Sequence, residues 1–258
     1  MPSAALTALE SLLSSHKLDH TLTSRLPEGA EHVHAPASSG LAALDGPLAG
    51  GLPRGQISEI VGPRSSGCQT MLVTWLAAAT ARGELAALVD PLDMFDPPSA
   101  AAHGLDLSRL LWVRGRALGP DRVSLPREIG ELREQVGRAV KALHLILQAG
   151  GFGLVALDLG EVPSATCGRL PFTTWRRLHR TIEGGETACV VVAPEPLARS
   201  AGGLTVALTT AGRAPATRLE VGPMLPEIEI AGRVTHGRGM QSAAVAWQPQ
   251  PSALSLKS

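Results

Sequence analysis

The chain has 258 residues with 44% hydrophobic and 18% charged side chains, a length that allows one α/β domain with a full core and short extensions. No apolar run approaches the roughly 20 residues that cross a bilayer, and the 3 scattered cysteines form neither a disulfide framework nor a CxxC pair. Because 23 basic residues balance 23 acidic ones, the whole molecule has no electrostatic attraction to nucleic acid, and DNA binding has to be argued from a local patch.

Residues 1–26 predict an N-terminal helical arm. Leucines recur at helical spacing over roughly residues 4–16, and a short amphipathic helix of this kind is expected to pack on its own core or on another subunit, because it cannot bury its apolar face alone. The start lacks the basic segment and apolar block of a secretory signal, so a cytoplasmic location with no membrane contact is expected. Residues 27–50, rich in Pro, Gly, Ala and Ser, predict a linker.

Residues 51–247 predict the core domain. Apolar runs of strand length alternate with segments of helical periodicity; the strands are expected at 56–61, 84–89, 110–114, 154–159 and 188–193, and the helices at 68–82, 126–149 and 171–183. This alternation predicts an α/β fold, a mostly parallel sheet flanked by helices. After residue 194, closely spaced strand-like pieces such as LTVALTT, separated by Gly and Pro, predict antiparallel strands at the C-terminal edge of the sheet. Residues 248–258 are expected to form a flexible tail.

A glycine-bracketed loop follows the first predicted strand. In EIVGPRSSGCQT, two glycines stand between a strand and a helix, which is typical of a loop whose backbone N–H groups cradle a phosphate. Phosphoryl transfer also needs a lysine after the second glycine and then a Ser or Thr that ligates Mg²⁺, and this chain has Cys68 and Gln69 there. The candidate loop residues are Gly62, Arg64, Ser65, Ser66, Gly67, Cys68 and Gln69.

Two residues of this loop allow alternative interpretations. Arg64 could supply a compensating cation for the absent lysine, or it could point to solvent as a loop tip. Cys68 stands at a helix N-terminus and could be a reactive thiol, or it could be a small residue tolerated where the lysine is missing.

Two longer segments around the loop resemble the ATPase core of the RecA-like superfamily: GGLPRGQISEIVGPRSSGCQT and ARGELAALVDPLDMFDPPSAAAHGLDLSRLLWVRG. The resemblance continues through LVALDL and fades after about residue 194. It implies a RecA-like P-loop core. By this resemblance the phosphate-loop lysine falls on Cys68, the Mg²⁺-binding hydroxyl residue on Gln69, and the catalytic glutamate on Leu92, with Asp93 one position off.

The resemblance also covers the base and metal sites. The tyrosine that stacks on adenine falls on Ser99 and the sensing glutamine on Pro194, whereas Asp158 matches the Walker B aspartate. A buried or capping aspartate would explain Asp158 equally well. The resemblance therefore implies a pseudo-ATPase rather than an enzyme, with no cofactor and no metal, while residual binding of phosphate, sulfate or nucleotide in the loop stays open. A weak nucleotide-dependent ATPase, rescued in part by Arg64 and Asp158, is the alternative.

Segments outside the core resemble the ImuA group, RecA-like proteins encoded with mutagenic translesion polymerases. They are LESLLSSHKLDHTLTS, RLPFTTWRRLHRTIE and VVAPEPLARSAGGLTVALT. This resemblance implies a non-hydrolysing accessory protein in DNA-damage-induced (SOS) translesion synthesis. The implied partners are an ImuB-type inactive relative of Y-family polymerases, through it an error-prone C-family polymerase, and RecA itself, with DNA contacted weakly or indirectly.

Other candidate sites are local. GRVTHGRG places Arg233, His236 and Arg238 among glycines and is the candidate for direct DNA contact, as a DNA-binding recombination mediator would need. TTWRRLHR could present its arginines to phosphate or to an acidic partner, or simply form a solvated helix face. The histidines His16, His20, His32 and His34 lack further ligands at diagnostic spacing, so no metal site is expected.

Overall fold

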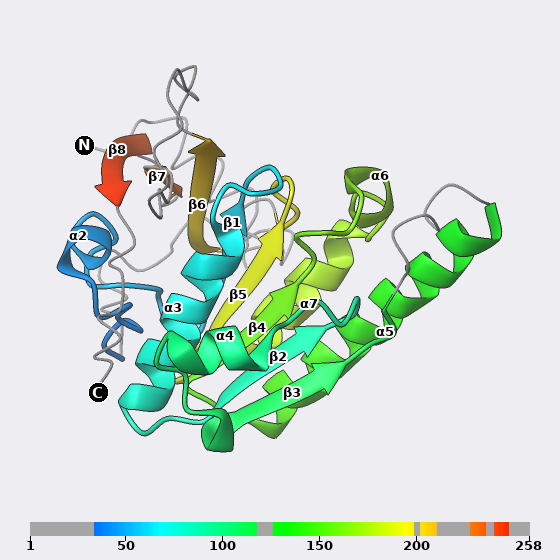
Figure 1. Cartoon of the computed structure of the whole chain (residues 1–258), viewed down its shortest axis with the longest axis horizontal. Coiled ribbons are helices and arrows are strands. Elements are labelled where there is room, and N and C mark those ends of the chain that lie inside the picture. The colour runs from blue at the N-terminus through cyan, green and yellow to red at the C-terminus, as the bar shows by residue number, and fades with distance from the viewer. Residues whose placement is uncertain (1–33, 118–125, 199–201, 211–227, 236–239, 248–258) are drawn as a thin grey trace, which may run out of the picture. The chain divides into compact units, whose positions relative to one another are not determined.

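The computed structural model describes residues 34–117, 126–198, 202–210, 228–235 and 240–247 (Figure 1). They belong to one compact unit, His34–Ser258. Its centre is an eight-stranded sheet of order β3-β2-β4-β5-β1-β6-β7-β8. The strands are β1 (Ile57–Val61), β2 (Ala86–Asp90), β3 (Leu110–Arg114), β4 (Leu154–Asp158), β5 (Ala188–Ala193), β6 (Gly202–Thr210), β7 (Ile228–Thr235) and β8 (Met240–Trp247).

Six strands, from β3 across to β6, pair in parallel, and β7 and β8 add to β6 in antiparallel fashion. The prediction of an α/β fold with a mostly parallel sheet and an antiparallel C-terminal edge is confirmed. One detail differs, because the first piece after residue 194, LTVALTT, lies in β6 and runs parallel to β1. The local pattern of a strand does not encode its direction. Here the direction follows from the connection between β5 and β6, which lie on either side of β1 and both run parallel to it.

Helices cover both faces of the parallel strands. On one face α3 (Cys68–Ala81) and α4 (Pro97–Ala102) pack with strand residues such as Leu88, and on the other α5 (Pro126–Ala149), α6 (Ser164–Cys167) and α7 (Phe172–Ile182) pack with residues such as Val89. Every residue of β1, β2, β4 and β5 is buried, as continuous apolar runs predict for strands covered on both faces. A 3₁₀ helix spans Leu107–Arg109.

Residues 37–52 fold onto the core, although the sequence predicts a linker over 27–50. Helix α2 (Ala42–Asp45) is held by the Asp45 carboxylate, which accepts hydrogen bonds from Ser38 Oγ (2.6 Å) and the Ser39 backbone N–H (2.8 Å). Leu44 and Leu48 are buried in the same cluster as α3. The glycines and small residues of this segment therefore serve tight turns on a packed surface.

A buried carboxylate fixes the crossover from β5 to β6. Glu59 on β1 is 3% exposed, and its Oε1 accepts the backbone N–H groups of Leu197 (2.6 Å) and Ala198 (2.8 Å). Burial raises the pKa of Glu59, and these hydrogen bonds oppose the rise. Gly203, at the start of β6, lies so close to the Ile57 carbonyl that any side chain would clash there.

Within the residues that the structure describes, none of the helices combines the length and the apolar character that spanning a membrane requires.

Candidate functional site

The glycine loop joins β1 to α3, as predicted. Ser65 (φ 62°) and Gly67 (φ 92°) take left-handed backbone conformations, and the Gly67 carbonyl accepts the Met71 N–H (2.9 Å) to start the helix. A Cβ atom on Gly62 would lie 2.5 Å from Ser66 Oγ and 2.8 Å from the backbone oxygen of Leu208. Only glycine fits at Gly62, so the loop curls tightly against β6.

Two small polar side chains fill the inside of this curl. Ser66 is 3% exposed and Cys68 is 9% exposed, and Ser66 Oγ lies 3.2 Å from Cys68 Sγ. Burial raises the pKa of the Cys68 thiol; the hydrogen bond with Ser66 opposes this rise and the Asp158 carboxylate adds to it. A thiol with a raised pKa is protonated at neutral pH and is a poor nucleophile. The geometry therefore favours Cys68 as a packed small residue over a reactive thiol.

Gln69 and Asp158 meet across the loop. Asp158 ends β4, its Oδ2 accepts Gln69 Nε2 (2.6 Å) and its Oδ1 accepts the Gly160 N–H (3.0 Å). Burial raises the pKa of Asp158 to about 6, and the hydrogen bonds from Gly160 and Gln69 oppose the rise. Both carboxylate oxygens thus have protein donors, and an amide N–H stands where a Mg²⁺ ligand is expected from the resemblance.

Arg64 forms an ion pair with Glu161 at the mouth of the loop. The Arg64 side chain is 76% exposed and that of Glu161 is 26% exposed. The guanidinium is therefore held by a carboxylate, although it remains in contact with water. The sequence did not single out Glu161; its position three residues after Asp158 was the available signal.

The acidic residues after β2 have structural partners. Asp90 is 1% exposed and accepts the backbone N–H groups of Met94 (3.1 Å) and Phe95 (2.9 Å). Leu92, at the position of the family's catalytic glutamate, is buried among apolar side chains. Asp93 accepts two hydrogen bonds from the Arg114 guanidinium (2.7 and 2.9 Å), which hold the pKa of Asp93 below its usual range. Asp93 therefore does not replace the glutamate as a free carboxylate.

A pocket of about 290 Å³ lies beside the first turn of α3, lined by Gln69, Thr70, Val73, Met94, Phe95, Asp96, Ser99, Ala100 and His103. Ser99, at the position of the adenine-stacking tyrosine, donates a hydrogen bond to Asp96. Phe95 is 9% exposed and packs its edge against Trp112, with ring centroids 5.2 Å apart. Among the described residues of this pocket, no aromatic face is free for stacking.

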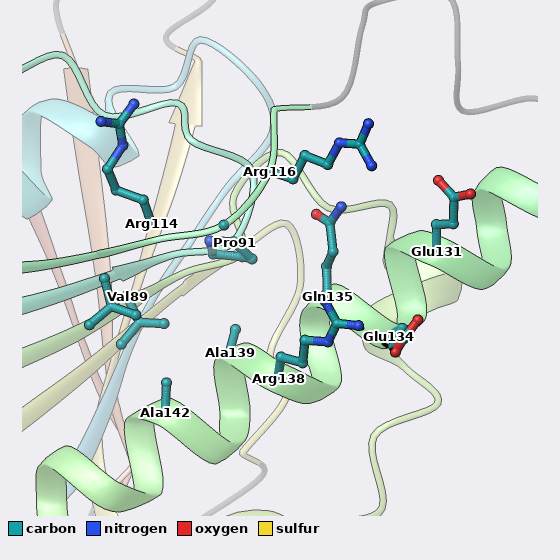
Figure 2. Close-up of a pocket in the computed structure, with 12 residues that line it drawn as sticks. Val89, Pro91, Arg114, Arg116, Glu131, Glu134, Gln135, Arg138, Ala139 and Ala142 are labelled. Atoms are coloured by element: carbon teal, nitrogen blue, oxygen red, sulfur yellow. Dashed lines mark hydrogen bonds and ion pairs between the residues drawn. The ribbon is translucent and has the colours of Figure 1, made fainter.

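A larger cleft of about 530 Å³ opens at the other side of β2, between the ends of β2 and β3 and helix α5 (Figure 2). Its lining shares no residue with the glycine loop. In the amide orientation that satisfies its hydrogen bonds, Gln135 donates to the carbonyls of Pro91 (3.0 Å) and Arg116 (3.2 Å). The charged lining residues Arg114 and Arg138 pair with Asp93 and Glu134. No sequence motif indicated this cleft.

The remaining candidates come from other segments of the sequence. Arg233 belongs to β7, where only the backbone is described, and His236 and Arg238 lie outside the described residues. His34 Nδ1 is 3.7 Å from a Glu186 carboxylate oxygen; His16, His20 and His32 also lie outside the described residues. Pro194 directly follows β5 and has no side-chain amide. The predicted hairpin site therefore stays a prediction.

The known proteins to which this chain is similar are RecA proteins. The RecA N-terminal domain family matches residues 16–121. The chain is 32% identical over 184 residues to "Protein RecA" of Chlorobaculum parvum, a match that covers 65% of this chain and 48% of that protein. The core of this chain is RecA-like. "Protein RecA" of Arthrospira platensis is 33% identical over 173 residues, covering 65% of this chain and 44% of that protein.

The similarity is strongest over a shorter stretch. "Protein RecA" of Nostoc punctiforme is 47% identical over 74 residues, which are 29% of this chain and 21% of that protein. The chain spans about half the length of the curated relatives it matches. The family match over residues 16–121 includes the glycine loop.

Proposed function

We propose that this chain is a non-hydrolysing RecA-fold accessory protein that acts as a scaffold in DNA-damage-induced translesion synthesis. The observation that supports the loss of hydrolysis is the hydrogen bond from Gln69 Nε2 to Asp158 Oδ2 (2.6 Å). In this proposal the chain keeps the RecA-like architecture and uses it for protein contacts.

The electrostatics of the loop support this proposal. Phosphoryl transfer depends on cations that neutralise the phosphates, and a single added arginine can change the rate by roughly 10³–10⁵. Cys68 is buried and its raised pKa keeps it uncharged. A Mg²⁺ ion at Asp158 would have to displace the Gln69 N–H group from the carboxylate. The only ligand that Gln69 could then offer is its amide oxygen, in place of the hydroxyl that a Ser or Thr would supply. Metal binding and charge neutralisation are thus both weakened.

The alternative, a weak ATPase, would use Arg64 and Asp158. Each of these side chains already has a partner, Glu161 for Arg64 and Gln69 for Asp158. A nucleotide would have to break both interactions before it gained any. The Arg64–Glu161 pair is exposed and costs little to break, so it is the hydrogen bond to the buried Asp158 that favours the scaffold over the weak ATPase.

The role in translesion synthesis rests on the resemblance to the ImuA group. The proposed partners are an ImuB-type inactive polymerase relative, an error-prone C-family polymerase reached through it, and RecA. To test this, the tagged full-length chain would be purified from its own cells after DNA damage, and the co-purifying proteins identified by mass spectrometry. Recovery of the two polymerase-related proteins without added nucleotide is expected; recovery of neither would refute the role.

A binding measurement tests the loss of nucleotide chemistry separately. Titration of the purified chain with a fluorescent ATP analogue and Mg²⁺ is expected to show no saturable binding in the micromolar range. The double variant Cys68→Lys/Gln69→Thr restores the family's residues and is expected to gain Mg²⁺-dependent binding if the backbone cradle is intact. Saturable micromolar binding by the unmodified chain that Arg64→Ala abolishes would instead support the weak ATPase. Circular dichroism of each variant controls for folding.

A further inference from the structure

The cleft between β2, β3 and α5 lies where the chain leaves two neighbouring strands toward opposite faces of the sheet. Strands β2 and β3 pair in parallel. After β2 the chain passes to α4, whose Ala100 is buried on the same face as α3, and after β3 it passes to α5, whose Ala139 is buried on the other face. In open α/β sheets, ligands bind in the crevice that such a divergence opens beyond the carboxyl ends of the strands. The cleft therefore has the position of a ligand site.

The walls of the cleft are fixed by backbone contacts. The Gly115 N–H donates a hydrogen bond to the Asp90 carbonyl (2.7 Å), and any side chain at Gly115 would clash with the backbone oxygen of Pro91. Because only glycine fits there, the ends of β2 and β3 approach each other closely. The Gln135 amide, which donates to the carbonyls of Pro91 and Arg116, joins α5 to both strand ends. The cleft is therefore preformed, as small-molecule sites usually are.

The floor of the cleft is apolar. It is lined by Val89 of β2, Val113 of β3 and two alanines of α5, Ala139 and Ala142. Figure 2 shows both alanines pointing from the helix toward the strands. The volume of about 530 Å³ lies within the roughly 300–1,000 Å³ that is usual for sites of small molecules. A floor of this kind suits the hydrocarbon or aromatic body of a ligand.

The rim of the cleft carries a cation that is free to bind. Two of the lining arginines have carboxylate partners, since Arg114 pairs with Asp93 and Arg138 pairs with Glu134. Arg116 is exposed, and its side chain forms no ion pair within the part of the chain that the structure describes. Figure 2 shows this side chain extending outward from the end of β3 at the mouth of the cleft. A ligand with one negative charge would pair with Arg116 without breaking an ion pair.

The carboxylates of the rim limit the charge that a ligand can carry. Glu131 and Glu134 also line the cleft and are exposed, so they balance the charges of Arg116 and Arg138. A ligand with several negative charges, such as a polyphosphate or a nucleic acid, would be repelled by these carboxylates. The balance of charge therefore favours a monoanion.

We propose that this cleft binds a monocarboxylic acid with an apolar body. The carboxylate pairs with Arg116, whose guanidinium can donate two parallel hydrogen bonds to it, and the body lies on the apolar floor. The acid is either a free small molecule or the terminal carboxylate of a peptide that ends in an apolar residue, and both present the same chemistry to the site. The proposal depends neither on the glycine loop nor on the translesion role.

Ligand-observed NMR with the full chain tests the proposal, with 1-naphthylacetate as the probe. A dissociation constant of about 1 mM or below is expected for a ligand of about 14 non-hydrogen atoms. The neutral 1-naphthylacetamide has the same body without the charge, and it is expected to bind about fivefold more weakly, the upper end for an exposed ion pair. Inorganic phosphate, which lacks an apolar body, is expected not to displace the probe.

Three variants assign the binding to the cleft. Arg116→Gln is expected to weaken the acid about fivefold and to leave the amide unchanged, so that the protein no longer distinguishes the two ligands. Ala142→Leu fills part of the floor and is expected to weaken both ligands about fivefold or more. The matched control is Arg176→Gln on α7, which removes an exposed arginine outside the lining of the cleft and is expected to change neither affinity. Thermal unfolding shows whether each variant is folded.

A peptide ending in a phenylalanine with a free carboxylate distinguishes the two sources of the acid. Tighter binding than naphthylacetate would assign a peptide terminus, and weaker binding a free acid. The proposal is overturned if naphthylacetate does not bind at about 5 mM, or if the acid and the amide bind equally well. It is also overturned if Arg116→Gln weakens both ligands alike, if Arg176→Gln weakens the acid as much, or if inorganic phosphate displaces the probe.

Discussion

In the glycine loop, the side chains that could meet a nucleotide are bonded to other side chains of the same chain, Arg64 to Glu161 and Gln69 to Asp158. On the outer side of α7, Arg176, Arg177 and Arg180 are exposed, and none of them forms an ion pair within the residues that the structure describes. A ligand at the loop must first break internal bonds, whereas an anion near these exposed arginines would displace only solvent and counterions. The two regions therefore differ in whether their charged side chains already have partners within the chain.

The first prediction tests how rigidly the loop is closed. Gly62→Ala would place Cβ 2.5 Å from Ser66 Oγ and 2.8 Å from the Leu208 carbonyl, so the loop or β6 must shift. The free energy of unfolding, measured by urea denaturation, is expected to fall by about 2–4 kcal/mol.

The matched control for this change is Gly137→Ala in α5. Nothing lies within 4 Å of a Cβ atom at Gly137, so this substitution is expected to stabilise the protein by about 0.5–1 kcal/mol through helix propensity. Equal effects of the two substitutions would show that the loop has room to relax, and the account of a closed loop would then be wrong.

The second prediction concerns the pH dependence that Asp158 confers. The pKa of Asp158 is raised to about 6 in the folded protein, above the roughly 3.9 of an unfolded chain. The folded state therefore holds the proton more tightly, and this group's contribution to stability falls as pH rises from about 4 to 6. Asp158→Asn removes this dependence. The free energy of unfolding of the variant minus that of the unmodified protein is expected to be about 1–2 kcal/mol higher at pH 8 than at pH 4.5.

Urea denaturation of both proteins at the two pH values measures this difference. A loss of stability at pH 8 in Asp158→Asn would mean that the charged carboxylate is well stabilised by Gln69 and Gly160. In that case the surroundings of Asp158 would stabilise a charged carboxylate, and they would suit a cation better than the raised pKa of Asp158 indicates.

The third prediction isolates the amide of Gln69. Gln69→Ala removes the donor to Asp158 Oδ2 and leaves that buried oxygen without its partner. The free energy of unfolding at pH 8 is expected to fall by about 1 kcal/mol, as for a typical hydrogen bond, and the pKa of Asp158 is expected to rise further. Thr70→Ala, one position away on the same helix, serves as the control. No change in Gln69→Ala would indicate that water replaces the amide at no cost.

The sequence was sufficient for the fold because continuous apolar runs mark strands that are buried on both faces, as in β4 and β5. It was also sufficient to locate the loop, whose glycines are required by the backbone itself. It was not sufficient for residues 37–52, where Pro, Gly and Ser indicate a linker but form turns over buried leucines. Composition reports how freely a segment can bend and says nothing of what it packs against.

Partners distant in sequence were the other limit. Gln69 and Asp158 are 89 positions apart, Arg64 and Glu161 are 97 apart, and Glu59 holds a backbone segment 138 positions away. No local pattern relates these residues, so the sequence left two interpretations open for Arg64 and for Asp158 and could not show the partner that each of them has. The direction of β6 was missed for the same reason, since it depends on a contact with β1.

The last prediction concerns the ion pair between Arg64 and Glu161 and has the smallest expected effect on stability. Glu161→Ala removes the partner of Arg64, and because the Arg64 side chain is 76% exposed, no measurable change in the thermal unfolding midpoint is expected. If nucleotide binding is lost because the lysine and the hydroxyl residue are absent, then Glu161→Ala will not bind the fluorescent ATP analogue even though Arg64 has no ion-pair partner. If the variant instead gains Mg²⁺-dependent binding that Arg64→Ala removes, then the ion pair is what blocks the loop. In that case the Glu161 carboxylate alone would keep Arg64 from a nucleotide, and the loop would differ from the exposed arginines of α7 only by that one ion pair.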